Sequence, residues 1–393
     1  MRSNPLAYLD DELNGLRAQG VLRPLRVLDG EQAAHASIDH RAVVNLSSNN
    51  YLGFTTHPRL RQRALEALTS LGVGTGSVRT IAGTMQIHME LERRLAVFKR
   101  TDAAVVFQSG FAANAGTVSA LLGRDDVIVS DELNHASIID GARLSRATIK
   151  VFPHRDVAAA RRILEELPRG QRTLLITDGV FSMDGDLGAV PGLCDLADEF
   201  GCIMMVDDAH ASGVFGSEGR GTIDHFGLHG RVDVQVGTLS KALGALGGYV
   251  AGSRSLIEFL YRRARPFLFS TSHPPSVAAT CLAALDVLES EPQWMERLWQ
   301  NTRFFKGGLQ ALGFNTGGSE SPITPVIVGD GALAMTLSDR LFEAGVFAQG
   351  IAFPTVARNR ARVRTIVTAT HTQEDLQFAL DAFRRVGAEL GII

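Results

Sequence analysis

The 393-residue chain has little of what marks secreted, membrane or nucleic-acid-binding proteins. It contains only three cysteines and no CxxC pair, so we expect a reduced, cytoplasmic protein rather than a disulfide-stabilised one. A net charge of −3 gives no reason to expect nucleic acid or an anionic membrane as a partner. No signal-peptide pattern opens the chain, and no apolar run reaches the ~18 residues of a membrane span. These absences predict a soluble globular protein, large enough for two domains.

The apolar residues that are present form strand-length runs that alternate with helical segments. The runs lie at 103–107, 127–129, 149–152, 174–176, 203–206 and 232–236. They lack polar alternation, which is typical of parallel strands covered by helices on both faces. The segment 248–252 follows the last run too closely for a helical crossover, so we expect it to be antiparallel. The pattern predicts an α/β domain over residues 54–280.

The two ends of the chain have a different pattern. The segment 1–53 carries leucines at helical spacing between Leu6 and Leu16, which predict an amphipathic helix, and a short strand at 43–46. The segment 281–393 predicts a smaller α+β domain. Around and within it we expect helices at 277–288, 294–312, 333–344 and from 373, and strands at 324–328, 346–351 and 362–367.

Polar residues follow several of the apolar runs, and in open α/β sheets ligands bind beyond the carboxyl ends of the strands. Asp207 comes directly after the run 203–206. A buried carboxylate is costly unless it is compensated, for example by the protonated nitrogen of a pyridine ring. Plain hydrogen bonding in the core is an alternative, as is a metal site shared with His210, although no further ligands lie nearby.

Small residues follow the run 103–107 at Ser109, Gly110 and Phe111, just before a predicted helix. The free N–H groups of a helix N-terminus can bind phosphate there, whereas an ordinary N-cap at Ser109 is the simpler alternative. His135 follows another run and could stack on a planar ring or serve a structural role. Ser182 lies in a segment rich in hydroxyl and acid groups that a turn would also explain.

Lys241 lies among small and apolar residues in the segment 236–249. Poor hydration disfavours the charged form of a lysine, and a partly neutral amine can form a Schiff base with an aldehyde. A solvated loop lysine is the alternative. Thr238 gives the spacing of the SxxK motif of penicillin-recognising enzymes, but their Ser-Asp-Asn and Lys-Thr-Gly tripeptides are absent from the sequence. Thr238 is instead a candidate phosphate ligand.

Taken together, these segments resemble the α-oxoamine synthases, fold-type I pyridoxal phosphate (PLP) enzymes that join an amino acid to an acyl-CoA. The resemblance covers nearly the whole chain. It is carried by the segments 48–53, 134–141, 178–185, 206–210, 237–241, 265–270 and 361–364. It implies a mostly parallel sheet with one antiparallel strand, a smaller C-terminal α+β domain, PLP as cofactor, and a homodimer with the active site at the subunit interface.

The resemblance also implies roles for individual residues. Lys241 would hold PLP as a Schiff base and remove the α-proton of the amino acid, while Asp207 would pair with the pyridine nitrogen. His135 would stack on the ring, and His210 would donate to a developing oxyanion. Further cofactor-binding positions would be Ser109, Gly110, Phe111, Ser182, His210 and Thr238, with Ser270 and Thr271 supplied by the neighbouring subunit. Substrate positions would be Arg23, Asn49, His135, Thr355 and Arg364, of which Arg364 would bind the amino-acid carboxylate.

Within the family, the chain is most similar to two groups of enzymes. We expect glycine and acetyl-CoA as substrates, giving 2-amino-3-oxobutyrate as in threonine degradation (glycine C-acetyltransferase). The alternative is 8-amino-7-oxononanoate synthase, which uses L-alanine and pimeloyl-CoA in biotin biosynthesis, and one enzyme could do both. An aminotransferase is a more remote alternative. A catalytically inactive module is not expected, because both Lys241 and Asp207 are present.

Overall fold

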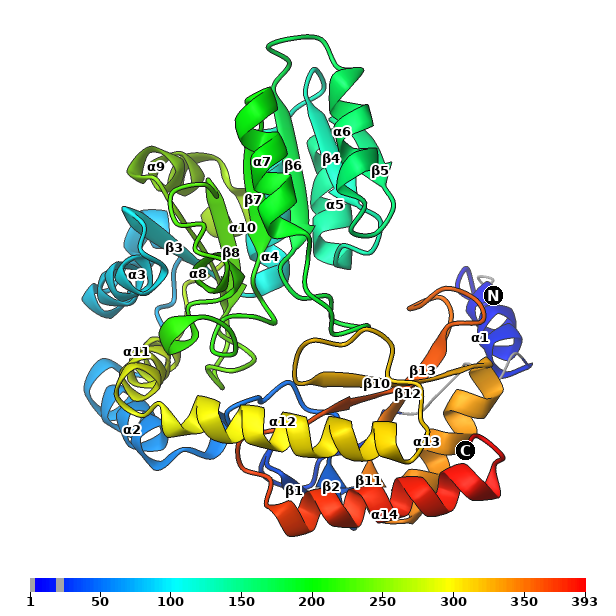
Figure 1. Ribbon diagram of the computed structural model, residues 1–393. Helices are drawn as coiled ribbons and strands as arrows, with labels where there is room; N and C mark the ends of the chain where they lie inside the picture. Colours follow the sequence, from blue (N-terminus) through cyan, green and yellow to red (C-terminus); the bar gives the residue numbers. More distant parts are fainter. Residues whose placement is uncertain (1–3, 19–24) are drawn as a thin grey trace.

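The computed structural model describes residues 4–18 and 25–393 and has a seven-stranded sheet at its centre (Figure 1). The strand order is β3-β9-β8-β7-β6-β4-β5. The strands are β3 (Ala103–Phe107), β4 (Val127–Asp131), β5 (Thr148–Phe152), β6 (Thr173–Asp178), β7 (Ile203–Asp207), β8 (Val234–Thr238) and β9 (Gly248–Gly252). Only β9 runs antiparallel to its neighbours β3 and β8. The predicted mostly parallel sheet with one antiparallel strand is therefore confirmed.

Helices cover both faces of this sheet. One face carries α4 (Gly110–Leu121), α5 (Ala136–Ser145), α9 (Arg254–Arg263) and α10 (Arg265–Leu268). The other carries α3 (Gln86–Lys99), α6 (Val157–Glu165), α7 (Val190–Phe200) and α8 (Thr222–His225). Each face of the sheet packs into its own hydrophobic core, and successive strand residues pack into opposite ones. In β4, Ile128 is fully buried in one core and Val129 in the other. This two-sided burial explains why the strands read as continuous apolar runs.

Two smaller sheets lie below the large one in Figure 1. One has the order β1-β2-β11 and the other β10-β13-β12. Their strands are β1 (His35–Ile38), β2 (Arg41–Asn45), β10 (Ile323–Gly329), β11 (Val346–Phe347), β12 (Gln349–Ile351) and β13 (Ala361–Ile366). The helices of this region are α12 (Gln293–Ala311), α13 (Gly331–Glu343) and α14 (Gln373–Glu389). The domain boundaries at 53/54 and 280/281 remain predictions.

The prediction of one strand over 346–351 was wrong. The segment forms two short strands in different sheets: β11 runs parallel to β2, and β12 pairs antiparallel with β13. The chain changes sheets at the buried Ala348. On either side of this residue the Ser47 hydroxyl bonds the backbone, donating to the Phe347 carbonyl at 3.3 Å and accepting the Gln349 N–H at 2.9 Å.

Several elements were not predicted or have other bounds. Strand β1 forms an antiparallel hairpin with β2, and α2 (Pro58–Leu71) packs against α11 (Pro275–Ser290). Strand β8 begins two residues later than predicted. Short helical turns lie at Phe54–Thr56, Arg79–Gly83 and Ser217–Gly219.

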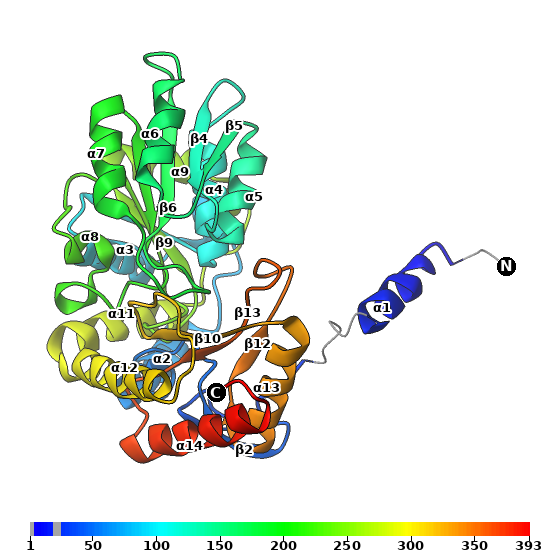
Figure 2. The same cartoon turned by 45° about the vertical axis from the view of Figure 1, so that its right-hand side comes forward.

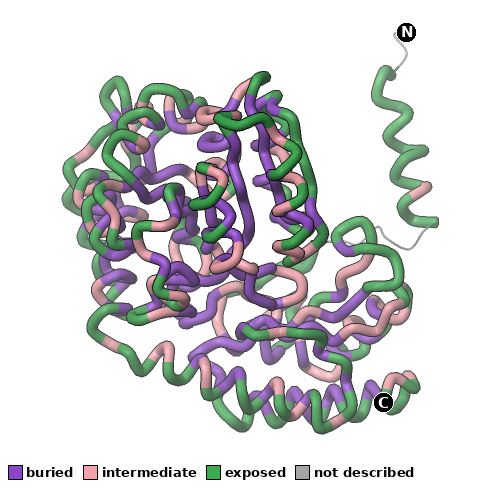
Figure 3. Tube along the Cα trace, turned by 45° about the horizontal axis from the view of Figure 1, so that its top comes forward, coloured by how far each residue is buried: buried purple, intermediate pink, exposed green. Residues whose placement is uncertain are grey.

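The predicted N-terminal helix is present as α1 (Tyr8–Ala18), but none of its residues is buried. Figures 2 and 3 show it standing away from the rest of the molecule. No helix among the described residues has both the length and the apolar character that crossing a membrane requires.

Candidate active site

The polar residues that follow the strands of the large sheet converge on a cavity of about 160 Å³. It lies beyond the carboxyl ends of β6, β7 and β8 and at the N-terminus of α4. The predicted site residues that line it are Gly110, Phe111, His135, Ser182, Asp207, His210, Thr238 and Lys241. Residues on its wall that were not predicted include Asn114, Ser137 and Asp178.

Asp207 is the last residue of β7 and is only 5% exposed. Its Oδ2 accepts a hydrogen bond from Nδ2 of Asn114 at 2.6 Å, and its Oδ1 accepts the Ala209 N–H at 2.8 Å. Asn114 also donates to Oγ of Ser137 at 2.9 Å. Asp207 forms no ion pair within the described part of the chain. The carboxylate is thus held by two neutral donors and lines the cavity, where it can accept a hydrogen bond from a ligand.

The adjacent Asp208 has its own cation. It is fully buried and accepts a hydrogen bond from Nζ of Lys99 at 3.0 Å, and Lys99 is itself 1% exposed. Thr222 adds donors from its hydroxyl and its backbone N–H. Any side chain at Gly221, whose φ is +103°, would collide with the Asp208 carboxylate. This pair fixes the backbone directly after Asp207 and leaves Asp207 facing the cavity.

Lys241 lines the cavity together with two carboxylates, Asp207 and Asp178. Burial lowers the pKa of Lys241 to about 8, although both carboxylates act to raise it. The pKa of Asp178 is raised well above its usual range because the group is buried beside Asp207. Its Oδ2 accepts the backbone N–H of His135 at 3.0 Å. The side chain predicted to be a partly neutral amine therefore has the surroundings that make it one.

His210 is buried and stays neutral. Burial lowers its pKa well below the usual value, and the positive charges of Lys241 and Arg364 lower it further. Its Nδ1 lies 2.7 Å from the hydroxyl of Tyr51, which is 1% exposed. Burial raises the pKa of the Tyr51 hydroxyl, which therefore keeps its proton and can donate to Nδ1. Nε2 is then the nitrogen that carries the proton and is available to a ligand.

His135 is both a helix cap and part of the cavity wall. It is the N-cap of α5, and its Nδ1 accepts the Ser137 N–H at 3.2 Å and lies 2.7 Å from Oγ of Ser137. Desolvation at the wall lowers its pKa. The two interpretations of His135 that the sequence left open, structural and ligand-facing, are therefore compatible.

The other end of the cavity is the N-terminus of α4. Ser109 is the N-cap, and its Oγ accepts the Ala112 N–H at 3.0 Å, so the simpler prediction for this residue is confirmed. A side chain on Gly110 would come within 3.5 Å of Thr238, so the Thr238 hydroxyl lies beside the first turn of the helix. A side chain on Gly248 would collide with Gly110. This glycine therefore lets β9 approach the helix N-terminus.

Two predicted substrate residues meet at the edge of the cavity. Nη1 of Arg364 donates to the Ser182 carbonyl at 3.0 Å, and Nη2 donates to Oδ1 of Asn49 at 3.2 Å. Arg364 lies on β13 and Asn49 follows β2, so both of the small sheets contribute to this edge.

A wider cavity of about 610 Å³ adjoins the first and shares His135 and Ser182 with it. Its apolar wall includes Phe181 and Phe353, and the predicted Thr355 lies on the same wall. A small site that opens into a larger, partly apolar one suits a small substrate meeting a longer one.

Five predicted residues in the described chain line neither cavity: Ser109, Asn49 and Arg364, whose contacts are given above, and Ser270 and Thr271. The Thr271 carbonyl accepts from Nε2 of Gln108 at 2.8 Å, just before Ser109. Arg23 lies outside the described residues.

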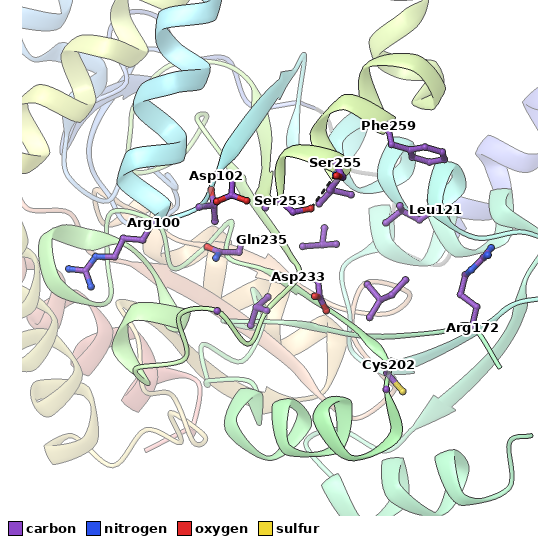
Figure 4. A pocket seen from close by; sticks show the side chains of 18 residues that line it. Arg100, Asp102, Leu121, Arg172, Cys202, Asp233, Gln235, Ser253, Ser255 and Phe259 are labelled. Atoms are coloured by element: carbon purple, nitrogen blue, oxygen red, sulfur yellow. Dashed lines mark hydrogen bonds between the residues drawn. The ribbon is translucent and has the colours of Figure 1, made fainter. Parts of the chain in front are cut away.

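A still larger cavity, of about 880 Å³, lies at the opposite edge of the large sheet, where β3, β7 and β8 begin (Figure 4). Its wall includes Arg100, Asp102, Asp233 and Gln235 (Figure 4). None of the predicted site residues lies there, and ligands of such sheets bind at the other edge. The smaller cavity around Asp207 is therefore the candidate active site despite its size.

The metal-site alternative is not supported by a ligand set. Among residues 4–18 and 25–393, no group of three or more His, Cys, Asp and Glu side chains is placed to hold a metal ion. Asp207 and His210 instead contact Asn114 and Tyr51.

Comparison with known proteins agrees with this geometry. Residues 41–383 match the family described as aminotransferase class I and II. An 8-amino-7-oxononanoate synthase from Symbiobacterium thermophilum is 60% identical over 387 residues, which cover 98% of this chain and 99% of the relative. 8-Amino-7-oxononanoate synthase 1 from Bacillus subtilis is 52% identical, with 98% of each chain covered. The structure of serine palmitoyltransferase from S. paucimobilis with a bound PLP–myriocin aldimine superposes with a TM-score of 0.94 at 33% identity, covering 100% of both chains.

The candidate site fits PLP. Among the described residues, the buried Asp207 carboxylate forms no ion pair and Oδ1 of the neighbouring Asn114 has no hydrogen-bond partner, and the N-terminus of α4 faces the same cavity. These features complement a protonated ring nitrogen, a ring substituent and a phosphate. From the family match, the relatives and this donor set together, the chain belongs to the class I and II aminotransferase family and is a PLP-dependent α-oxoamine synthase.

Proposed function

We propose that this α-oxoamine synthase joins L-alanine to pimeloyl-CoA with loss of carbon dioxide, as an 8-amino-7-oxononanoate synthase of biotin biosynthesis. The observation that carries the proposal is the 60% identity, over nearly the whole length of both chains, to a relative of that name. Further relatives of the same name are 56% and 54% identical. The expectation of glycine and acetyl-CoA has no support among these relatives, which favour the alternative.

PLP supplies an aldehyde that takes up an amine and a ring that stabilises negative charge on the adjacent carbon. Lys241 would hold the aldehyde, Asp207 the ring nitrogen, and the N–H groups of Gly110 and Phe111 the phosphate. His135 lies on the cavity wall, where it can cover one face of the ring. The donors around Asp207 support its role, because they are neutral and the carboxylate forms no ion pair with another described residue.

The chain's own residues then position and deprotonate the substrate. The guanidinium of Arg364 would bind the carboxylate of the amino acid, which Asn49 helps to orient. Once free, the Nζ of Lys241 would take the proton from the α-carbon, because a pKa of about 8 leaves a far larger neutral fraction of the amine near neutral pH than an ordinary lysine has. Nε2–H of His210, fixed by Tyr51, would donate to the thioester oxygen as charge develops on it.

The lowered pKa of Lys241 predicts how cofactor capture depends on pH. Only the neutral amine attacks an aldehyde, so the rate at which the apo-protein binds PLP covalently is expected to rise with pH and level off above about 8. Burial of the amine is the main cause of the low midpoint. The carboxylates of Asp207 and Asp178 raise the midpoint, whereas the positive charge of Arg364 lowers it. Capture is measured by borohydride fixation and mass spectrometry. A midpoint near the ordinary lysine value of 10.5 would contradict the predicted burial.

Substrate choice is tested by crossing L-alanine and glycine against pimeloyl-CoA and acetyl-CoA and measuring CoA release. We expect the largest kcat/KM with L-alanine and pimeloyl-CoA. The methyl group that separates the amino acids supports about 10- to 200-fold discrimination. Keto acid formed without an acyl-CoA would indicate an aminotransferase, and preference for glycine with acetyl-CoA would overturn the proposal in favour of the other group of enzymes.

We also propose a homodimer in which the neighbouring subunit completes the site with Ser270 and Thr271. Their position supports this, since they line neither cavity of their own chain. Phe111 and Phe269, which flank this region, leave 47% and 68% of their surface exposed. The three cysteines are free, which suits a reducing cytoplasm.

A further inference from the structure

Three arginines form a row along the start of β13. Arg364 and Arg362 lie two residues apart in the strand, and Arg360 directly precedes it. Alternate residues of a strand share a face, so the row spans about 13 Å at ~3.3 Å per residue. Arg364 lies at the edge of the small cavity, whereas Arg362 and Arg360 line the wider one.

The three arginines contact successive residues of the segment 182–184, which leads away from the small cavity. Arg364 donates to the carbonyl of the first residue of this segment at 3.0 Å. Arg362 donates to the carbonyl of Met183 at 2.9 Å and to Oδ1 of Asp184 at 2.7 Å. Arg360 reaches the same Asp184 oxygen only at 3.8 Å. The order of contacts shows that Arg360 is the outermost member of the row.

Arg360 is also the member with donors to spare. The Arg362 side chain is 2% exposed, and its donors bond Met183, Asp184 and the carbonyl of Arg360. The Arg360 side chain is 58% exposed, and its one ion-pair contact with another described residue is to a carboxylate that Arg362 already binds more closely. The guanidinium of Arg360 can therefore reorient to bind a ligand without losing a strong hydrogen bond.

The wall of the wider cavity that Arg360 lines is largely apolar and includes Ile139, Phe181, Phe353 and Val356. The other charged side chains on this wall are Asp184, bound to Arg362, and Glu132, whose Oε1 accepts the His154 N–H at 2.8 Å. A ligand that extends from the small cavity into the wider one thus meets apolar surface and, at the outermost arginine of the row, an available cation.

We propose that Arg360 binds the carboxylate at the distal end of the acyl chain and thereby selects a dicarboxylic acyl-CoA over a monocarboxylic one. This inference rests on the proposed function, because pimeloyl-CoA carries such a carboxylate. The apolar wall takes the methylene chain, and the guanidinium replaces the water that a carboxylate would lose on entering the cavity.

The test compares pimeloyl-CoA with heptanoyl-CoA, which has the same seven carbons but ends in a methyl group. The readout is the ratio of the two kcat/KM values with L-alanine, measured on the PLP-loaded enzyme. We expect R360Q to lower this ratio about tenfold, as for the loss of one charge-assisted hydrogen-bond pair, and R360E to lower it further. In the wild type alone, the ratio should fall as salt is added.

The matched control is R358Q, which removes the same charge from the same loop. The Arg358 guanidinium lies 4.3 Å from the centre of the Phe353 ring and does not line the cavity, so its loss should leave the ratio unchanged. Equal losses with both acyl-CoAs in R360Q would place Arg360 at the CoA phosphates and overturn the inference while the proposed function stands. An R358Q effect as large as that of R360Q would overturn it as a nonspecific charge effect. A wild type inactive with pimeloyl-CoA would overturn the proposed function itself.

Discussion

Replacing Lys241 with alanine is expected to lower kcat by at least about 10⁴-fold and to abolish covalent attachment of PLP. The substitution removes both the amine that holds the cofactor and the base that takes the α-proton, and a positioned base alone contributes about 10²- to 10⁴-fold. The rest of the cofactor site should stay in place in this variant, because Asn114 holds Asp207 and the N-terminus of α4 does not depend on the lysine. The variant should therefore still bind PLP, but reversibly and without the absorbance band of the lysine Schiff base.

The chain provides an internal control for this result. Burial also lowers the pKa of Lys306 to about 8, yet its Nζ donates to the carbonyls of Ser319 and Ser321, away from the candidate site. Borohydride reduction followed by peptide mapping should label Lys241 and leave Lys306 unlabelled. Labelling of both would mean that a low pKa alone captures the aldehyde. Turnover and fixed cofactor that survive in the alanine variant would show that another residue is the attachment point.

Replacing Lys99 with methionine is expected to lower the free energy of unfolding by about 3–5 kcal/mol. The substitution keeps the length of the side chain but leaves the fully buried Asp208 without its cation. The hydroxyl and the backbone N–H of Thr222 remain as donors to Asp208, but they cannot replace a positive charge at 3.0 Å. Urea denaturation of the apo-protein, followed by tryptophan fluorescence, measures the loss.

The double variant with Asp208→Asn as well separates the ion pair from general damage to packing. With both charges removed, no unpaired charge remains, so the double variant should be more stable than Lys99→Met alone. If the two substitutions are simply additive, the pair contributes nothing specific and the loss comes from packing. Because Asp208 follows Asp207 directly, Lys99→Met should also weaken PLP binding, whereas a distant destabilising substitution should not.

The sequence predicts those site residues that lie at the end of a strand or directly after it in the chain. Asp207 ends an apolar run, and Lys241 and Thr238 follow another, so the topology of a parallel sheet is enough to bring them together. Asn114 had one local signal, a polar side chain in the otherwise apolar first turns of α4, but its partner is 93 residues away. Its role in orienting Asp207 depends on how α4 packs on the sheet, which periodicity does not specify.

The errors in the fold have a similar origin. The segment 346–351 reads as one strand because its composition suits a strand throughout, and the change of sheet at Ala348 depends on Ser47, about 300 residues earlier. Tyr51 lies in the segment 48–53, which helps to carry the family resemblance, yet its bond to His210 spans 159 residues. Helix α1 was predicted correctly from its leucines, but that pattern could not show that the described chain leaves every one of its residues unburied.

The parallel pairing of β2 with β11 has a consequence for how the protein is made. Strand β2 leaves the ribosome early, whereas its partner at Val346–Phe347 is synthesised about 300 residues later. Until then the β1-β2 hairpin has one edge unpaired, and isolated hairpins are marginally stable in water. The strands of the large sheet are complete by Gly252, so that sheet can form before β11 is made. A nascent chain that stops before β11 would therefore present an open strand edge, the kind of surface that chaperones bind and that other chains pair with.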